Sequence, residues 1–156
     1  MTPVAAPKRL LFVEGNLDGT IGGSFYSLLF LVQGLDKTRF APTVMFSVPN
    51  ALIARYEAAG ARVIVRLNAA PVQLHGGLAG RLVSRVANFL LAFVIEPRRL
   101  AGLCRVERFD LVHLNNSVTG NLPWMLGAWW AGIPCITHER GINSTVSGRV
   151  RICARF

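Results

Sequence analysis

The sequence has few acidic residues, few cysteines and no long apolar run. It contains 8 acidic residues against 17 basic ones, and its 3 cysteines are too widely spaced for a metal-binding pattern or a disulfide framework. The phosphate-binding loop G-x-x-x-x-G-K-[ST] is missing, and no cluster of acidic residues suggests a divalent metal site. We therefore expect neither a P-loop nor a bound metal, and we expect the cysteines to be buried or incidental thiols.

The longest apolar run is short for a membrane span. It extends over residues 86–95 and is interrupted by Asn88, whereas a spanning helix needs about 20 apolar residues. Near the N-terminus, Lys8 and Arg9 precede only four apolar residues before Glu14, which is too few for a signal peptide. The sequence therefore predicts no membrane-spanning helix, no export signal and a cytoplasmic location.

The shortage of acidic residues leaves a formal net charge of +9, and all but two of the 17 basic residues are arginine. Such a balance predicts an anionic partner, which could be nucleic acid, anionic lipid or a phosphorylated substrate. Few aromatic residues lie among the basic ones, so a stacking platform for single-stranded nucleic acid is not evident.

Apolar segments of strand length alternate with segments of helical periodicity, over a length that suits one domain. A long helical segment before the fourth strand is expected to break at Pro97, and a further helix is expected from Ser144. Strands are predicted at residues 9–13, 42–48, 62–67, 111–114 and 134–137, and shorter helices at 23–35, 51–59 and 121–131.

This alternation predicts an α/β fold, a doubly wound Rossmann-like parallel sheet with helices on both faces and strand order 3-2-1-4-5. In such a sheet, ligands bind beyond the carboxyl ends of the strands, where the winding direction reverses. Three loops should therefore line the site, at residues 14–23, 115–120 and 138–143.

The first of these loops is rich in glycine and precedes a helix. Gly22 and Gly23 permit a close backbone approach to a ligand, and Ser24 follows them. The free N–H groups at the start of the helix would attract an anion. The spacing is not the dinucleotide pattern G-x-G-x-x-G, and a plain strand-to-helix turn is the alternative.

The other two loops are polar. Asn115, Asn116 and Ser117 could bind sugar hydroxyls, or one of them could cap the next helix. His138 could move a proton or donate a hydrogen bond, and Arg140 suits a phosphate. Glu139 and Gly141 complete this third group, for which an internal Glu–Arg ion pair is the alternative.

The segment from residue 80 to residue 95 has a polar stripe containing Arg81, Arg85 and Asn88 and a wide apolar face that includes Phe89 and Phe93. A helix of this kind can lie in a membrane interface. The alternative is a helix buried between the sheet and a neighbouring element. The arginines favour the membrane, so Arg81, Arg85, Phe89 and Phe93 are predicted to face it.

Several motifs, in this order and spacing, resemble family-4 glycosyltransferases. They are Arg9-Leu10-Leu11-Phe12-Val13, Gly22-Gly23-Ser24, Leu28-Leu29 with Gly34-Leu35, Gly60-Ala61-Arg62-Val63, Phe109-Asp110-Leu111-Val112-His113-Leu114-Asn115-Asn116-Ser117, and Ala131-Gly132-Ile133-Pro134-Cys135 through His138-Glu139-Arg140-Gly141. The resemblance covers nearly the whole chain. It implies one half of a GT-B fold, in which two Rossmann-like domains face each other across a cleft.

The resemblance also implies a function and roles for residues. Residues 1–156 would be the N-terminal, acceptor-side domain, with the donor-binding C-terminal domain absent. The whole enzyme would be retaining and metal-independent, and would move a sugar from a nucleotide-sugar to a lipid-linked or cell-envelope glycan. Gly22 and Gly23 would approach the donor diphosphate, and His138 would be catalytic. Many relatives carry residues like His-x-His where Asn115 and Asn116 stand.

From this resemblance we expect no cofactor and no nucleic acid, but a nucleotide-sugar, a glycan or lipid-linked acceptor and an anionic membrane as partners. The protein would be cytoplasmic, peripheral on the cytosolic face of the membrane, and inactive as these 156 residues alone. Two other hypotheses remain: a non-catalytic Rossmann-like module that binds a nucleotide or phosphate, and a peripheral membrane interaction domain.

Overall fold

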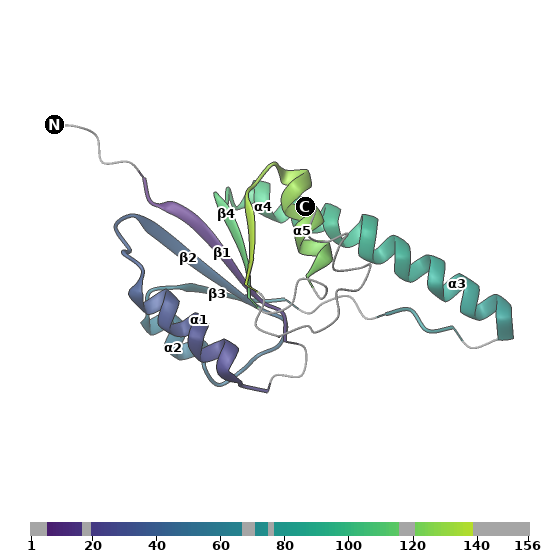
Figure 1. Ribbon diagram of the computed structural model, residues 1–156, viewed down its shortest axis with the longest axis horizontal. Helices are drawn as coiled ribbons and strands as arrows, with labels where there is room; N and C mark the ends of the chain where they lie inside the picture. Colours follow the sequence, from purple (N-terminus) through teal and green to yellow (C-terminus); the bar gives the residue numbers. More distant parts are fainter. Residues whose placement is uncertain (1–5, 17–19, 67–70, 75–76, 116–120, 139–156) are drawn as a thin grey trace.

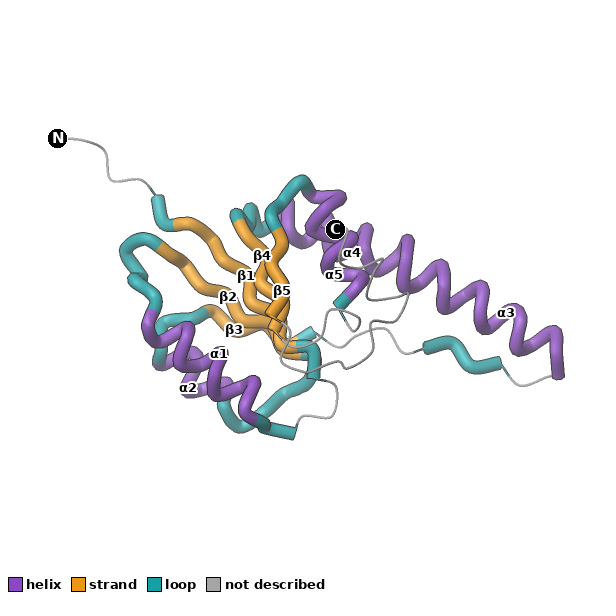
Figure 2. The backbone as a smooth tube through the Cα atoms, viewed as in Figure 1, coloured by secondary structure: helices purple, strands orange, loops and turns teal. Residues whose placement is uncertain are grey.

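The computed structural model describes residues 6–16, 20–66, 71–74, 77–115 and 121–138, and its centre is a five-stranded parallel sheet. The strand order is β3-β2-β1-β4-β5, which confirms the predicted topology (Figures 1 and 2). The strands are β1 (Lys8–Glu14), β2 (Phe40–Phe46), β3 (Arg62–Val65), β4 (Leu111–Asn115) and β5 (Cys135–His138).

One face of the sheet is covered by α1 (Gly23–Gly34) and α2 (Ile53–Ala58) (Figure 1). The apolar residues of α1 recur at helical spacing, so that one side of the helix enters the core. Alternate residues of β1, including Leu10 and Phe12, point into this same core. Tyr56 of α2 is fully buried there, and its hydroxyl donates a hydrogen bond of 2.6 Å to the carbonyl of Phe25.

The opposite face is covered by α4 (Glu96–Val106) and α5 (Leu122–Ala131). Leu11 and Val13, the remaining apolar residues of β1, point into this second core, so the sheet is buried on both faces as a parallel sheet requires. The two helices approach closely at Gly127, where a Cβ atom would lie 2.8 Å from that of Leu100. The helices on both faces confirm the predicted doubly wound fold.

A long helix precedes β4 and corrects the expected break at Pro97. Helix α3 (Gly77–Leu90) continues through a π-helical segment, η1 (Leu91–Ile95), into α4, at whose first turn Pro97 lies. A proline lacks an N–H donor and its ring crowds the carbonyl one turn back. The wider π-helical turn lies just where this carbonyl would clash, so the helix continues without a break.

This continuous helix, Gly77–Val106, is long and apolar enough to cross a membrane by length and composition, with a mean hydropathy of 1.6 in its best 18-residue window. The expectation that no segment could do so is wrong by this measure, because two arginines lower the average of such a window only modestly. No residue of α3 is buried in the described part of the chain, so the alternative of a core helix is also wrong.

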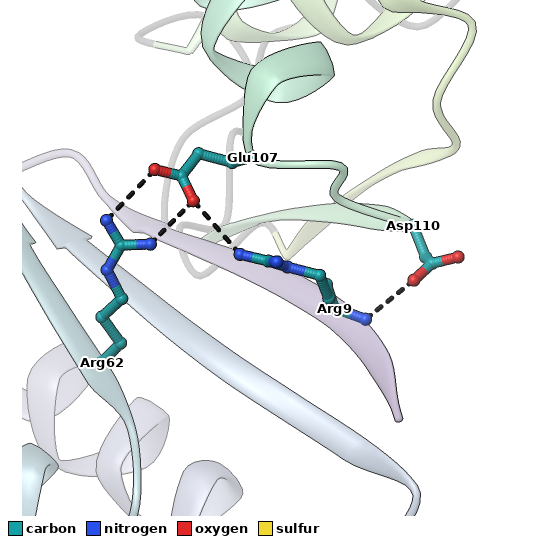
Figure 3. A network of polar contacts seen from close by, with 4 residues as sticks. All are labelled: Arg9, Arg62, Glu107 and Asp110. Carbon is teal, nitrogen blue, oxygen red and sulfur yellow. Dashed lines mark hydrogen bonds and ion pairs between the residues drawn. The ribbon is translucent and has the colours of Figure 1, made fainter. Parts of the chain in front are cut away.

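At the amino ends of the strands, an ion-pair network joins β1, β3 and the turn before β4 (Figure 3). The carboxylate of Glu107 accepts hydrogen bonds from both terminal nitrogens of Arg62, at 2.7 and 3.1 Å, and from Nη2 of Arg9 at 3.1 Å. Asp110 accepts from the backbone N–H of Arg9 at 2.8 Å and from Nζ of Lys8 at 3.0 Å. This network lies at the end of the sheet opposite the candidate site.

The network predicts a loss of stability in acid. The hydrogen bonds from Arg62 lower the pKa of Glu107, and the backbone N–H of Arg9 lowers that of Asp110. Each carboxylate therefore stabilises the fold fully above its ordinary pKa, and this contribution is lost as the pH falls through the lowered value, from about pH 5 downward. Urea unfolding across this range should show Glu107→Gln less stable than wild type at neutral pH and less sensitive to acid.

The matched control is Glu57→Gln, on the exposed surface of α2. Glu57 forms no ion pair with any residue that the structure describes. This variant should lose stability in acid as steeply as the wild type. Equal acid sensitivity of all three proteins would show that the Glu107 network does not stabilise the fold.

Candidate functional site

Buried polar side chains gather at the carboxyl ends of the strands. Glu14 ends β1, Asn115 ends β4, Ser47 follows β2, and Asn121 lies at the start of α5; all four are buried. Burying such groups is costly unless they are hydrogen-bonded, so their presence at one end of the sheet needs a reason. This end contains the point between β1 and β4 where the winding reverses, which is where sheets of this kind bind ligands.

Asn115 connects three elements at this point. It is the last residue of β4, fully buried, and not part of an open loop as the sequence suggested. Its Nδ2 donates to Oε2 of Glu14 at 2.5 Å and to the carbonyl of Ser24 at 3.2 Å. One amide thus links the end of β1 to the first turn of α1, while its predicted contact with a ligand stays a prediction.

Glu14 is the site residue that the sequence analysis missed as an individual side chain. It is fully buried and bonded to Asn115. A signal for it exists in the sequence, since a carboxylate directly follows the apolar run Leu10–Val13 and precedes the glycine-containing loop. A buried carboxyl group in that position has to be hydrogen-bonded within the fold, because burying a polar group without a partner is costly.

The start of α1 presents backbone N–H groups, of which that of Phe25 already donates to the carbonyl of Gly22 at 3.1 Å. Gly22 is the N-terminal cap in an extended conformation, no side chain among the described residues caps the helix, and no acidic residue lies in its first turn. Gly22 and Gly23 are exposed, and a Cβ atom on either would meet no described atom within 4 Å. The positive end of the helix is therefore open to an anion beside the point of reversal.

His138 lies at the same end of the sheet, one strand away from Asn115. It is the last residue of β5, it is exposed, and it pairs in register with Asn115. Its ring centre lies 6.1 Å from that of His113, which is buried and packs edge-on against Phe12. Because Phe12 belongs to the core beneath α1, His138 and the start of α1 lie on the same side of the sheet.

The remaining predicted site residues of the polar loops lie outside the described residues. They are Asn116, Ser117, Glu139, Arg140 and Gly141. The described cysteines offer no nucleophile, because burial raises the pKa of the Cys104 and Cys135 thiols to about 11. Among the described residues, no three His, Cys, Asp or Glu side chains gather in a way that could hold a metal ion.

The predicted membrane-facing residues lie away from this site, on the helix that projects to the right in Figure 1. Arg81, Arg85 and Phe89 are exposed and Phe93 is half-buried, with the rings of Phe89 and Phe93 stacked 4.6 Å apart. Asn88, expected on the open polar stripe, is instead hydrogen-bonded to the backbone of Val72.

No family model matches the chain. A curated relative is the UDP-N-acetylglucosamine–N-acetylmuramyl-(pentapeptide) pyrophosphoryl-undecaprenol N-acetylglucosamine transferase of Synechococcus, which is 36% identical over 84 residues. The match covers 52% of this chain and 22% of the relative, so the chain spans about a fifth of the relative's length.

Solved structures share the fold. A glycosyltransferase from Rickettsia africae has a TM-score of 0.57 at 12% identity, over 91% of this chain and 32% of that one. The Anabaena protein HepE, in complex with UDP and glucose, has a TM-score of 0.55 at 18% identity, over 94% and 34%. The C-terminal domain of a hydrogenase from Pyrococcus furiosus also matches, with a TM-score of 0.52 at 15% identity, over 88% and 95%.

The hydrogenase match shows that the fold alone does not select an activity. The sequence match is to a glycosyltransferase, and the GT-B type is supported by the structural neighbours, while membership of family 4 stays a prediction. In sequence and in fold, the chain is therefore similar to a glycosyltransferase and is consistent with the N-terminal, Rossmann-like domain of a GT-B enzyme.

Proposed function

We propose that this chain is the acceptor-binding half of a glycosyltransferase that moves a sugar from a nucleotide-sugar to a lipid-linked acceptor of the cell envelope. The observation that carries the proposal is the 36% identity over 84 residues to a transferase named for a pyrophosphoryl-undecaprenol acceptor. The start of α1 beside the reversal point supports it, because the N–H groups of Gly23 and Ser24 at the positive end of the helix suit a diphosphate.

In this proposal, the described residues divide the work at the cleft. Gly22 and Gly23 let the backbone of α1 approach the donor diphosphate. The positive end of α1 then stabilises the negative charge that develops on the leaving group. His138 lies beside the reacting centre and moves a proton or binds a hydroxyl. The buried pair of Glu14 and Asn115 holds the first turn of α1 in place.

A GT-B cleft has two walls, and this chain supplies one of them. The second Rossmann-like domain would bind the nucleotide-sugar, so we expect residues 1–156 alone to show no turnover. The resemblance to family 4 further implies retention of the anomeric configuration without a metal ion. Product NMR in the presence of EDTA tests both properties, and an inverted product or a loss of activity on chelation would contradict them.

The test of the proposed function compares residues 1–156 with a longer protein that joins them to a second Rossmann-like domain. UDP-N-acetylglucosamine and UDP-glucose serve as donors, and a short-chain polyprenyl diphosphate glycan serves as acceptor. We expect transfer from one of these donors by the longer protein and none by residues 1–156. Turnover by residues 1–156 alone would overturn the expected inactivity.

The same samples decide between the enzyme and the non-catalytic module. Calorimetry with UDP on residues 1–156 should show weak binding, because most donor contacts belong to the other wall of the cleft. Tight UDP binding by residues 1–156, together with no transfer by the longer protein, would favour a nucleotide-binding module instead.

A further inference from the structure

Helix α3 and the segment η1 carry the largest group of exposed apolar side chains outside the two cores. None of the best 18-residue window of this helix is buried, and α3 projects from the body of the fold (Figure 1). The exposed fractions reach 86% at Leu78, 63% at Leu82 and 57% at Phe89. The other exposed apolar residues are Val83, Val86, Leu90 and Ile95. An apolar surface this continuous marks an interaction site.

The opposite side of α3 is already occupied by the chain itself. Residues 71–74 form an extended strap beside the helix, visible under α3 in Figure 2. The N–H of Val72 donates to Oδ1 of Asn88 at 2.8 Å, and Nδ2 of Asn88 donates to the carbonyl of Val72 at 3.0 Å. The N–H of Leu74 donates to Oγ of Ser84 at 2.9 Å. The strap thus satisfies the polar groups at the middle of α3, and none of the described residues buries the apolar side.

The helix therefore has two distinct stripes. Residues 81, 84, 85 and 88 follow the spacing i, i+3, i+4, i+7 and form a polar stripe that carries Arg81 and Arg85. Residues 82, 86, 89 and 93 repeat in the same way and form an apolar stripe, at whose end the rings of Phe89 and Phe93 stack. An apolar stripe flanked by arginines is the pattern of a helix that lies in a membrane interface.

We infer that α3 and η1 lie in the plane of an anionic bilayer, with the apolar stripe among the acyl chains and Arg81 and Arg85 on lipid phosphates. This inference rests on the proposed function for its biological purpose, because a lipid-linked acceptor is found at a membrane. It deepens that function by naming the surface that holds the enzyme at the membrane. It also names the strap, residues 71–74, as the segment that orients α3.

A spanning orientation is disfavoured by the same residues. Arg85 lies near the middle of the exposed part of the helix, residues 77–95, where a spanning helix would place its charge at the centre of the bilayer, the most costly depth for an arginine. The end of the helix is also held in the fold, since Leu100, Ala101 and Cys104 of α4 are buried. A bilayer surface satisfies the arginines and the apolar stripe together.

A second copy of the chain is a poorer partner. Each copy has a formal net charge of +9, and docking two α3 helices would bring Arg81 and Arg85 of one copy toward those of the other. Like charges in one interface oppose association. An anionic bilayer complements this charge, with about 1 kcal/mol for each arginine near the surface.

Flotation of the purified chain with lipid vesicles tests the inference without any sugar transfer. Vesicles of phosphatidylcholine and phosphatidylglycerol in equal parts should carry the protein upward, and vesicles of phosphatidylcholine alone should carry much less. Phe89→Glu should weaken binding to the anionic vesicles by at least about tenfold, because it places a charge among the acyl chains. Arg81→Gln with Arg85→Gln should weaken it by about 25-fold, or fivefold for each arginine.

Matched controls lie elsewhere on the surface. Phe30, on the outer side of α1, is 62% exposed, so Phe30→Glu changes the same chemistry at another site and should leave binding unchanged. Arg39→Gln with Arg55→Gln removes the same charge as the α3 pair and should weaken binding much less. Circular dichroism of each variant checks that the helices are retained.

Three outcomes would overturn the inference. The first is equal vesicle binding by Phe89→Glu and Phe30→Glu, and the second is an equal loss of vesicle binding from both pairs of arginine replacements. The third is resistance of the bound protein to extraction by alkaline carbonate, because such resistance would indicate a spanning helix. The surface would belong to a second copy if the wild type did not bind vesicles, formed dimers in light scattering, and lost those dimers on the Phe89→Glu replacement. In the longer protein, transfer to a soluble short-chain acceptor should survive Phe89→Glu, so failure of docking and failure of the transferase are separable.

Discussion

Replacing Gly127 with valine should destabilise the protein by about 3 kcal/mol or more, because it forces α4 and α5 apart. A Cβ atom at residue 127 would lie 2.8 Å from Cβ of Leu100 and 3.1 Å from the carbonyl oxygen of Pro97. Neither neighbour is the flexible end of a side chain, so the backbone of one helix has to move. Urea unfolding at neutral pH measures the loss, and Gly127→Ala should show a smaller loss of about 1–2 kcal/mol, since better helix propensity offsets part of the clash.

The control for this prediction is Gly102→Ala, in the helix against which Gly127 packs. A Cβ atom at residue 102 would meet no described atom within 4 Å. This replacement should stabilise the protein by about 0.5–1 kcal/mol through the lower entropy of its unfolded chain and its higher helix propensity. If both alanine variants gained stability, α4 and α5 would not be packed as closely as the structure shows.

In a protein that joins this chain to the second domain, His138→Ala should lower kcat about 100-fold or more, the usual contribution of a general acid or base. His138 is exposed at the end of β5, so its removal should leave the unfolding free energy nearly unchanged. The readouts are kcat and KM for the nucleotide-sugar, together with unfolding in urea. The loss should fall on kcat, because the proposed role is in the reacting centre.

Ile136→Ala provides the comparison for His138→Ala on the same strand. Ile136 is 50% exposed and lies two residues earlier, so it points to the same side of the sheet. Its replacement should change kcat only slightly. A wild-type kcat in His138→Ala would remove His138 from the mechanism, and equal losses in both variants would indicate a general effect on β5.

Much of the fold follows from local patterns. The apolar run of β1 and the helical spacing of Phe25, Leu28 and Leu29 predict these elements because each pattern buries one surface of its own segment. The strand order also follows, since right-handed crossovers of alternating strands and helices allow few alternatives. The ends of the strands and shorter helices differ from the prediction by at most two residues, as at β4, which extends one residue further to Asn115.

The sequence predicts where the candidate site lies, but not the contacts between its side chains. The rule that ligands bind beyond the carboxyl ends of the strands points to the loops around Gly22 and His138. It does not reveal that the amide of Asn115 is turned inward onto Glu14 and the carbonyl of Ser24. That contact joins residues about 90 or more positions apart in the chain, and no periodicity reports on such a pair.

The sequence by itself determined the parallel sheet, its order and the amphipathic character of α3, because these depend on the spacing of apolar residues along single segments. The tertiary structure decided whether α3 is buried or exposed, how the helix passes Pro97, and which glycine can accept a side chain. Gly102 and Gly127 both lie within helices, and only the approach of a second helix distinguishes them. Burial is a property of what packs against a residue, so it arises when distant segments meet.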